Sequence, residues 1–370
     1  MNFEELGIRK DLVKALNELN IINPTPIQSD VIPILLKGST DLVGQAQTGT
    51  GKTAAYGLPL LQKIEPKKKV IQGLILCPTR ELGQQVAKQL FKFTKYTDKI
   101  FTEAVYGGAP IDKQIYSLKR PTHIVVATPG RLIDLLKKKA LDLKNVNTVI
   151  LDEADEMLSM GFKSELEEIL GYLSKAENKW LFSATLPHGI KQIVNQHLSE
   201  DAHKIEVSGR NVVNKHIDHQ YLVCDEYEKL NVLIEFLAKQ EENRGLIFCK
   251  TKVATQKLAK QLKAKNISAD AIHGDLLQKE RDKVMRAFKN ESLQILVATD
   301  LAARGIDVPD LAYVVHYQMP DQDDYYTHRS GRTARAGKNG LSYCIVTSQE
   351  MNTLRHLEKT LNIGFTQVQR

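Results

Sequence analysis

Cysteine is scarce in this sequence. Four cysteines occur among 370 residues, and they stand too far apart for a local CxxC pair or a metal knuckle: Cys77, Cys224, Cys249 and Cys344. Such usage is typical of a reducing compartment. The N-terminal segment 1–10 carries two glutamates and no apolar stretch, which excludes a secretory signal there. We therefore expect a cytoplasmic protein.

Long hydrophobic runs and low-complexity tracts are absent as well. No apolar stretch approaches the length of a bilayer-spanning helix, and no short-period repeat occurs, which excludes a helical membrane protein and a repeat array. The composition is that of a globular protein, with 42% hydrophobic and 26% charged residues, and the length predicts two or three domains. The formal net charge of +7 favours a polyanionic partner, because Lys and Arg neutralise phosphates; a solvated basic surface is the alternative.

Short apolar runs rich in Val and Ile alternate with segments of helical periodicity. The runs in the first half are Asp41–Ala46, Val70–Cys77, Ile100–Tyr106, His123–Ala127, Thr148–Leu151 and Lys179–Ser183. Those in the second half are Ile217–Cys224, Arg244–Cys249, Ala269–His273, Leu293–Ala298, Leu311–Tyr317 and Gly340–Thr347. Near-continuous apolar runs are typical of strands buried on both faces of a parallel sheet. We therefore predict an α/β protein with two doubly wound sheets of about six strands each.

A polar interval without periodicity begins at Ser208-Gly209-Arg210-Asn211. We place the linker there, which divides the chain into a first domain at 1–207, a linker at 208–214 and a second domain at 215–370.

The first predicted strand leads into a glycine-rich loop, Ala46-Gln47-Thr48-Gly49-Thr50-Gly51-Lys52-Thr53. It matches the P-loop pattern GxxxxGKS/T except that Ala46 replaces the first glycine. Such a loop turns backbone N–H groups toward phosphate oxygens, with the positive end of the next helix behind them. Lys52 would reach the β- and γ-phosphates of a nucleotide, and the Thr53 hydroxyl would coordinate Mg²⁺. A glycine-rich turn without a ligand is the alternative, and it predicts no acid partner elsewhere.

Such an acid partner follows another predicted strand. Val149-Ile150-Leu151 runs into Asp152-Glu153-Ala154-Asp155, and three carboxylates so close together repel one another unless a cation is bound. Asp152 fits a Mg²⁺ ligand that holds the ion through water, and Glu153 fits the group that orients and deprotonates the attacking water. A solvated helix N-terminus is the alternative, but the pairing with a P-loop indicates an NTPase that uses Mg²⁺.

The segment Asp152-Glu153-Ala154-Asp155 spells D-E-A-D, and the chain resembles the DEAD-box RNA helicases along almost its whole length. Pro24-Thr25-Pro26-Ile27-Gln28 resembles the adenine-reading segment of that family, and Phe3 matches its upstream aromatic residue. A glutamine amide can pair with adenine N6 and N7. Asn20-Ile21 departs from the family pattern of glycine followed by an aromatic residue that stacks on adenine.

The resemblance implies two RecA-like domains and a set of functional residues. The implied ATP-binding residues are Phe3, Ile21, Asn23, Gln28, Ala46, Gln47, Thr48, Gly49, Thr50, Gly51, Lys52, Thr53, Gly305 and Asp307. The implied RNA-binding residues are Pro78, Thr79, Arg80, Gly108, Thr128, Arg131, Gly274, Arg281 and Thr299. Asp155, Ser183 and Thr185 would couple the state of ATP to the grip on RNA. Arg332 and Arg335 are candidate arginine fingers, with Glu153 as the catalytic base.

The implied activity is ATP hydrolysis coupled to local unwinding of short RNA duplexes or to remodelling of RNA–protein complexes. RNA would bind in a cleft between the two domains, mainly through its sugar-phosphate backbone. Two alternatives stay open. One is a DNA translocase of the wider helicase superfamily, against which the D-E-A-D letters and the glutamine segment argue. The other is an ATP-gated RNA clamp, which would carry the same motifs.

Overall fold

Two parallel sheets organise the chain, one in each of two units that span Met1–Ser208 and Gly209–Arg370. The computed structural model describes residues 2–47, 49–207, 216–303, 311–334 and 338–370. The segment 208–214, which was predicted as the linker, lies outside the described residues. No helix in these ranges is long and apolar enough to cross a membrane.

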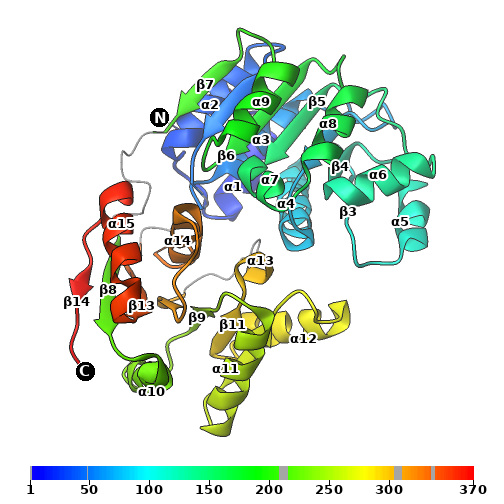
Figure 1. Ribbon diagram of the computed structural model, residues 1–370. Helices are drawn as coiled ribbons and strands as arrows, with labels where there is room; N and C mark the ends of the chain where they lie inside the picture. The colour runs from blue at the N-terminus through cyan, green and yellow to red at the C-terminus, as the bar shows by residue number, and fades with distance from the viewer. Residues whose placement is uncertain (1, 48, 208–215, 304–310, 335–337) are drawn as a thin grey trace. The chain divides into compact units, whose positions relative to one another are not determined.

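The sheet of the first unit has seven strands in the order β3-β4-β2-β5-β6-β1-β7 (Figure 1). All its pairings are parallel. The strands are β1 (Leu42–Gln45), β2 (Gly73–Leu76), β3 (Thr102–Val105), β4 (Ile124–Ala127), β5 (Thr148–Asp152), β6 (Asn178–Ser183) and β7 (His203–Glu206). The helices are α1 (Lys10–Glu18), α2 (Pro26–Leu36), α3 (Lys52–Lys63), α4 (Arg80–Phe93), α5 (Ile111–Leu118), α6 (Pro129–Lys137), α7 (Ala154–Ser159), α8 (Lys163–Tyr172) and α9 (His188–His197).

The helices cover both faces of this sheet. Apolar side chains of α1 to α4 pack into one cluster, and those of α5 to α9 pack into another on the opposite face. Alternate residues of one strand divide between the two clusters, as Ile150 and Leu151 of β5 do. Both faces are therefore buried, which explains why the strand segments are near-continuous apolar runs.

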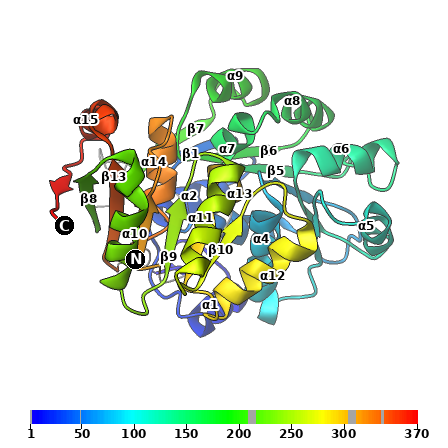
Figure 2. The same cartoon turned by 60° about the horizontal axis from the view of Figure 1, so that its bottom comes forward.

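The second unit repeats this architecture with the strand order β10-β11-β9-β12-β13-β8-β14. Figure 2 labels β8, β9, β10 and β13 of this sheet. Its strands are β8 (Ile217–Val223), β9 (Gly245–Phe248), β10 (Ala269–Ile272), β11 (Ile295–Ala298), β12 (Tyr313–His316), β13 (Gly340–Val346) and β14 (Thr366–Gln367). Its helices are α10 (Lys229–Ala238), α11 (Lys252–Ala264), α12 (Gln278–Lys289), α13 (Asp300–Ala303), α14 (Asp323–Ser330) and α15 (Met351–Leu361). Helices α10 and α11 pack on one face, and α12 to α15 supply the apolar clusters of the other.

The predicted class, α/β with doubly wound parallel sheets, is confirmed. The predicted count of about six strands per sheet is one strand too low, because β7 and β14 were not expected. Both are edge strands, and β14 pairs with only two residues of β8. Their residues are mostly exposed, so they lack the apolar run on which the prediction depended.

Candidate nucleotide and RNA sites

The carboxyl ends of parallel strands meet at one edge of a sheet, and the predicted motifs of the first unit lie at that edge. The glycine-rich loop follows β1, the acidic segment ends β5, and Ser183 ends β6. β6 pairs with both β1 and β5, so these three ends are adjacent. Ligands of open α/β sheets bind at such an edge.

Residues of the glycine-rich loop are hydrogen-bonded to one another. Gly49 and Gly51 have φ values of +82° and +91°, which residues with a side chain rarely adopt. The Lys52 ammonium donates to the Ala46 carbonyl at 2.9 Å, and the Thr50 hydroxyl donates to the Gln47 carbonyl at 2.7 Å. Thr48 lies outside the described residues. A nucleotide phosphate would offer Lys52 a stronger, charged acceptor than this carbonyl.

The glutamine of the adenine-reading segment is attached to the same loop. Gln28 is 3% exposed and donates from Nε2 to the Gly51 carbonyl at 3.0 Å, while its Oε1 accepts the Thr25 N–H at 2.9 Å. A Cβ on Gly51 would lie 2.4 Å from Gln28 Nε2, so only glycine permits this approach. Gln28 is thus positioned to respond to changes in the loop.

The remaining residues predicted to surround the adenine differ in burial. Phe3 lies in the core cluster beside α1 to α4, and Ile21 packs against that cluster. Asn23 is exposed. Asn20 has a φ of +57°, which explains how it can stand where the family pattern has glycine, since Asn tolerates the left-handed region better than most residues.

Asp152 is buried at the end of β5 and has one oxygen available. Its Oδ2 accepts a hydrogen bond from the Tyr56 hydroxyl at 2.8 Å, whereas Oδ1 has no partner among the described residues. Burial raises the pKa of Asp152, although the Lys52 ammonium and the Tyr56 hydroxyl act in the opposite direction. A cation at Oδ1 would compensate the charge of this buried carboxylate, so the site fits the Mg²⁺ that accompanies a nucleotide.

The described part of the chain has no group of three or more His, Cys, Asp or Glu side chains that could hold a metal. The carboxylate of Asp152 and the hydroxyl of Thr53 could hold Mg²⁺ together with phosphate oxygens and water, an arrangement typical of P-loop proteins.

Glu153 has an unusual backbone, with φ and ψ both at 52° in the left-handed region. For a residue with a side chain this conformation costs about 1–2 kcal/mol. It stands between the end of β5 and the start of α7, in the N-cap position of that helix, and it is 7% exposed. Strain of this kind often accompanies functional positions, which agrees with the predicted catalytic base.

The last acid of the segment binds the loop that follows β6. Asp155 Oδ2 accepts hydrogen bonds from the Thr185 N–H at 2.8 Å and the Thr185 hydroxyl at 2.9 Å. The Ser183 hydroxyl accepts the Asp155 N–H at 3.2 Å and donates to the Thr185 carbonyl at 2.7 Å. The three residues predicted to couple ATP to RNA thus form one hydrogen-bonded network.

The predicted RNA-binding residues of the first unit follow β2, β3 and β4. Pro78 is buried, and Thr79 caps α4 by accepting the Leu82 N–H. The Arg80 guanidinium lies over the Tyr106 ring, 4.7 Å from its centroid, at the end of β3. Gly108 has a φ of +78°, so the loop after β3 depends on a glycine there.

Arg131 is bonded to that same loop, from a position just after Thr128, the N-cap of α6. Its Nη1 donates to the Ala109 carbonyl at 3.0 Å and to Gln114 Oε1 at 2.9 Å. Its side chain is only 10% exposed. Arg131 therefore stabilises the loop after β3 by a hydrogen bond from a largely buried side chain. We expect a substitution of Arg131 to change RNA affinity at least partly by altering that loop.

In the second unit, three predicted RNA-binding residues gather at the ends of β10 and β11. Gly274 is exposed, and a Cβ added there would lie 3.6 Å from the Lys252 side chain. Arg281 donates to the Ala302 carbonyl at 2.9 Å, and the Thr299 hydroxyl accepts the Ala302 N–H at 3.4 Å. Arg281 and Thr299 are therefore joined through the short helix α13.

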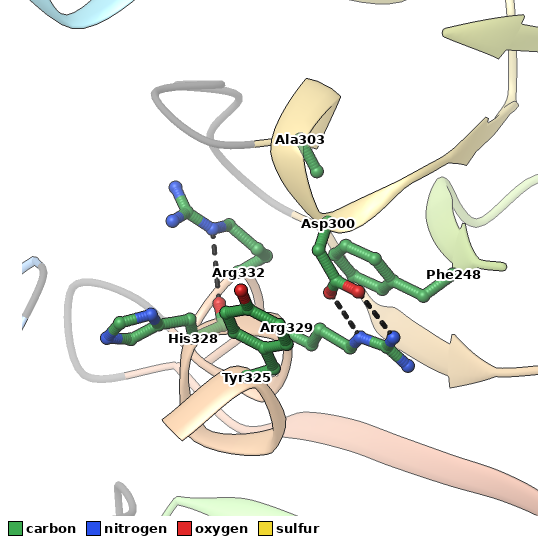
Figure 3. A pocket seen from close by; sticks show the side chains of 7 residues that line it. All are labelled: Phe248, Asp300, Ala303, Tyr325, His328, Arg329 and Arg332. Atoms are coloured by element: carbon green, nitrogen blue, oxygen red, sulfur yellow. Dashed lines mark hydrogen bonds and ion pairs between the residues drawn. The ribbon is translucent and has the colours of Figure 1, made fainter. Parts of the chain in front are cut away.

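The candidate arginine finger Arg332 follows α14 and borders a small pocket (Figure 3). The pocket is lined by Phe248, Asp300, Ala303, Tyr325, His328, Arg329 and Arg332. Arg332 donates from Nε to the His328 carbonyl at 3.2 Å and is 7% exposed. The other finger, Arg335, and the predicted nucleotide contacts Gly305 and Asp307 lie outside the described residues.

Sequence reasoning missed two residues of these sites. Arg329 is 1% exposed and makes a bidentate ion pair with Asp300, at 2.5 and 2.7 Å, while also donating to the Gln318 carbonyl. Tyr56, which bonds Asp152, stands four residues after Lys52 and so lies on the same side of α3. That spacing was the one signal in the sequence that could have identified Tyr56. No signal in the sequence distinguishes Arg329 from the other arginines of its segment.

Two family models match the chain. DEAD/DEAH box helicase matches residues 25–193, and the helicase conserved C-terminal domain matches residues 228–337. The DEAD-box ATP-dependent RNA helicase CshA of Bacillus cereus is 42% identical over 358 residues, which is 97% of this chain and 68% of that protein. CshA of Bacillus subtilis is 40% identical over 360 residues, 97% of this chain and 72% of that protein.

Solved structures match over nearly the whole chain. Dbp5 of S. cerevisiae bound to RNA and ADP BeF3 has a TM-score of 0.91 at 30% identity, covering 99% of this chain and 95% of that one. Mss116p bound to ssRNA and AMP-PNP has a TM-score of 0.89 at 29% identity, covering 99% and 78%.

Proposed function

Because this chain belongs to the DEAD-box family of ATP-dependent RNA helicases, we propose that it hydrolyses ATP at the glycine-rich loop and uses the cycle to open short RNA duplexes. One observation supports the assignment most directly. The glycine-rich loop, the acidic segment and the Ser183–Thr185 loop lie at three adjacent strand ends, and Asp155 and Thr185 are joined by hydrogen bonds.

We assign the chemistry to residues of the first unit as follows. Lys52 leaves the Ala46 carbonyl and pairs with the β- and γ-phosphates. Thr53 and Asp152, through its Oδ1, would hold Mg²⁺, which when bound would neutralise charge on the phosphate oxygens. Glu153 accepts a proton from the water that attacks the γ-phosphorus, and Gln28 selects adenine by hydrogen bonding.

The second unit is proposed to supply Arg332 and Arg335, which would stabilise charge on the γ-phosphate in the transition state. ATP and RNA would each favour the same closed arrangement of the two units. Their affinities are then coupled, and the coupling is reciprocal. Hydrolysis removes the γ-phosphate and with it the preference for the closed arrangement, so RNA is released.

RNA is proposed to bind at the strand ends of both units through phosphates and 2′-hydroxyls. Arg80 supplies a cation next to the Tyr106 ring, and Arg131 shapes the glycine loop to which the backbone binds. Gly274, Arg281 and Thr299 form the corresponding contact in the second unit. A cytoplasmic location and the domain bounds 1–207 and 215–370 stay predictions, checked by cell fractionation and limited proteolysis.

The experiment that tests this function is strand release from RNA duplexes of increasing length and similar stability per base pair. If a closed protein holds only a few nucleotides, the other base pairs must open spontaneously. Stacking is worth roughly 1.4 kcal/mol per step in DNA, so each added pair should slow release several-fold. Rates that hardly depend on length would indicate a translocating helicase. RNA-stimulated ATP hydrolysis without release from even the shortest duplex would indicate the RNA clamp.

A further inference from the structure

Tyr56 connects the glycine-rich loop, the acidic segment and the neighbouring strand. It is fully buried in α3, one helical turn after Lys52. Its hydroxyl donates to Asp152 Oδ2 at 2.8 Å. Its ring packs against Phe182 of β6, with centroids 5.2 Å apart and planes inclined by 52°. The Tyr56 ring therefore packs against Phe182, and its hydroxyl donates to a charged acceptor, the Asp152 carboxylate.

This contact determines how the Asp152 carboxylate is presented. A carboxylate has two oxygens, and here one of them is taken by a donor on a rigid helix. The other, Oδ1, is buried and has no partner among the residues that the structure describes. A half turn of the carboxylate only exchanges two equivalent oxygens, but a partial rotation would break a charge-assisted hydrogen bond, which is stronger than a neutral one. The Tyr56 bond therefore favours one orientation.

We propose that Tyr56 is a positioning residue: its hydroxyl orients Asp152 so that Oδ1 alone faces the Mg²⁺ that accompanies the nucleotide. The inference rests on the proposed role of Asp152 as a metal ligand. Groups that hydrogen-bond a metal ligand from behind fix its orientation, and their removal typically lowers metal affinity about 10- to 100-fold.

Packing alone does not explain the tyrosine. A phenylalanine would fill the same space and keep the ring contact with Phe182. The hydroxyl is the only added group, and a buried hydroxyl is unfavourable unless it is hydrogen-bonded. Asp152 supplies that hydrogen bond, so the two residues depend on each other.

The test is Tyr56→Phe, with Tyr96→Phe as a matched control. Tyr96 also donates its hydroxyl to a carboxylate, that of Glu18, but between α1 and the turn Thr94–Tyr96 that follows α4. Affinity for a fluorescent ADP is measured with EDTA and across a Mg²⁺ titration. Binding of Mn²⁺ to the protein–ADP complex is followed by electron paramagnetic resonance, which needs no catalysis.

We expect Tyr56→Phe to raise the Mg²⁺ concentration at half-saturation by about 10-fold or more, and to weaken Mn²⁺ binding likewise. The affinity for ADP in EDTA should stay within about twofold of the wild type. Tyr96→Phe should change neither quantity. Circular dichroism should show that Tyr56→Phe folds, since the ring is retained.

Asp152→Asn separates the two ways in which the inference can fail. If Asp152→Asn loses the Mg²⁺ dependence and Tyr56→Phe keeps it, Asp152 is a ligand and Tyr56 only fills space, which overturns the inference. If Asp152→Asn also keeps a normal Mg²⁺ dependence, the proposed metal role of Asp152 is wrong, and the inference is wrong with it.

Discussion

Replacing Thr185 by valine removes one hydrogen bond from the network that joins the acidic segment to the loop after β6. Thr185 donates twice to Asp155 Oδ2, from its N–H at 2.8 Å and from its hydroxyl at 2.9 Å. Valine has nearly the same shape and keeps the N–H bond and the branched side chain. The variant therefore weakens the network without removing it.

The magnitude follows from the charge and burial of the acceptor. Asp155 is 7% exposed, so water cannot easily replace the lost donor. A hydrogen bond to a charged group contributes about 1.5–3 kcal/mol net. If most of the free energy of this hydrogen bond contributes to the coupling between ATP and RNA binding, the coupling free energy should fall by about 1–2 kcal/mol. That corresponds to a loss of roughly 5- to 30-fold in the ratio of RNA affinities.

The assay measures RNA dissociation constants with a non-hydrolysable ATP analogue and with ADP, for the wild type and for each variant. Thr185→Val should lower the ratio of the two constants, and Thr185→Ser, which keeps a hydroxyl, should stay near the wild type. Unfolding in urea is measured alongside. An unchanged affinity ratio in Thr185→Val, together with a stability loss of about 1.5–3 kcal/mol, would show that the bond only holds the fold and would refute the reasoning.

Four further outcomes are expected. Lys52→Ala should weaken ATP binding in a filter assay, whereas Glu153→Gln should bind ATP normally and hydrolyse it slowly, because only Lys52 meets phosphate in the ground state. Arg332→Ala should lower RNA-stimulated turnover by about 10³-fold with little change in ATP affinity of the RNA-free protein, as measured by steady-state kinetics and equilibrium binding. Ile21→Phe should tighten ADP binding by about 0.5–1.5 kcal/mol in calorimetry if the new ring stacks on adenine. Burial lowers the pKa of His219 from 6.5 to about 4. Between these two pH values the imidazole therefore binds a proton in the unfolded chain but not in the folded chain. Stability should therefore fall as the pH drops from 6.5 toward 4, and His219→Gln should reduce this slope by up to about 1.4 kcal/mol per pH unit in urea melts.

The sequence predicted the strands that are buried on both faces. The run Thr148–Leu151 corresponds to β5 at Thr148–Asp152, and the run His123–Ala127 corresponds to β4 at Ile124–Ala127. In both cases the apolar run ends where the sheet ends, so the pattern also located the functional edge. The edge strands β7 and β14 could not be found in this way, because exposed residues leave no apolar run.

The candidate site was predictable as far as backbone geometry and motif spacing determine it. Gly49 and Gly51 do adopt positive φ values, and the acidic segment does begin at a strand end. The choice of hydrogen-bond partners was not predictable, because it depends on which side chains the tertiary fold brings together. Tyr56 stands 96 positions before Asp152, and nothing local connects them.

The arginines of the second unit show why residue type alone does not assign a role. Arg329 and Arg332 belong to one short segment and carry the same charge, and both side chains are largely buried. Arg329, however, already donates to both carboxylate oxygens of Asp300 and to the Gln318 carbonyl. Removing one partner of such a buried pair typically costs about 3–5 kcal/mol of stability, so a loss of activity at Arg329 would not identify it as catalytic. Only an arginine whose removal slows turnover in a protein that still folds and binds ATP can be called a finger, and Arg332→Ala has to meet this criterion.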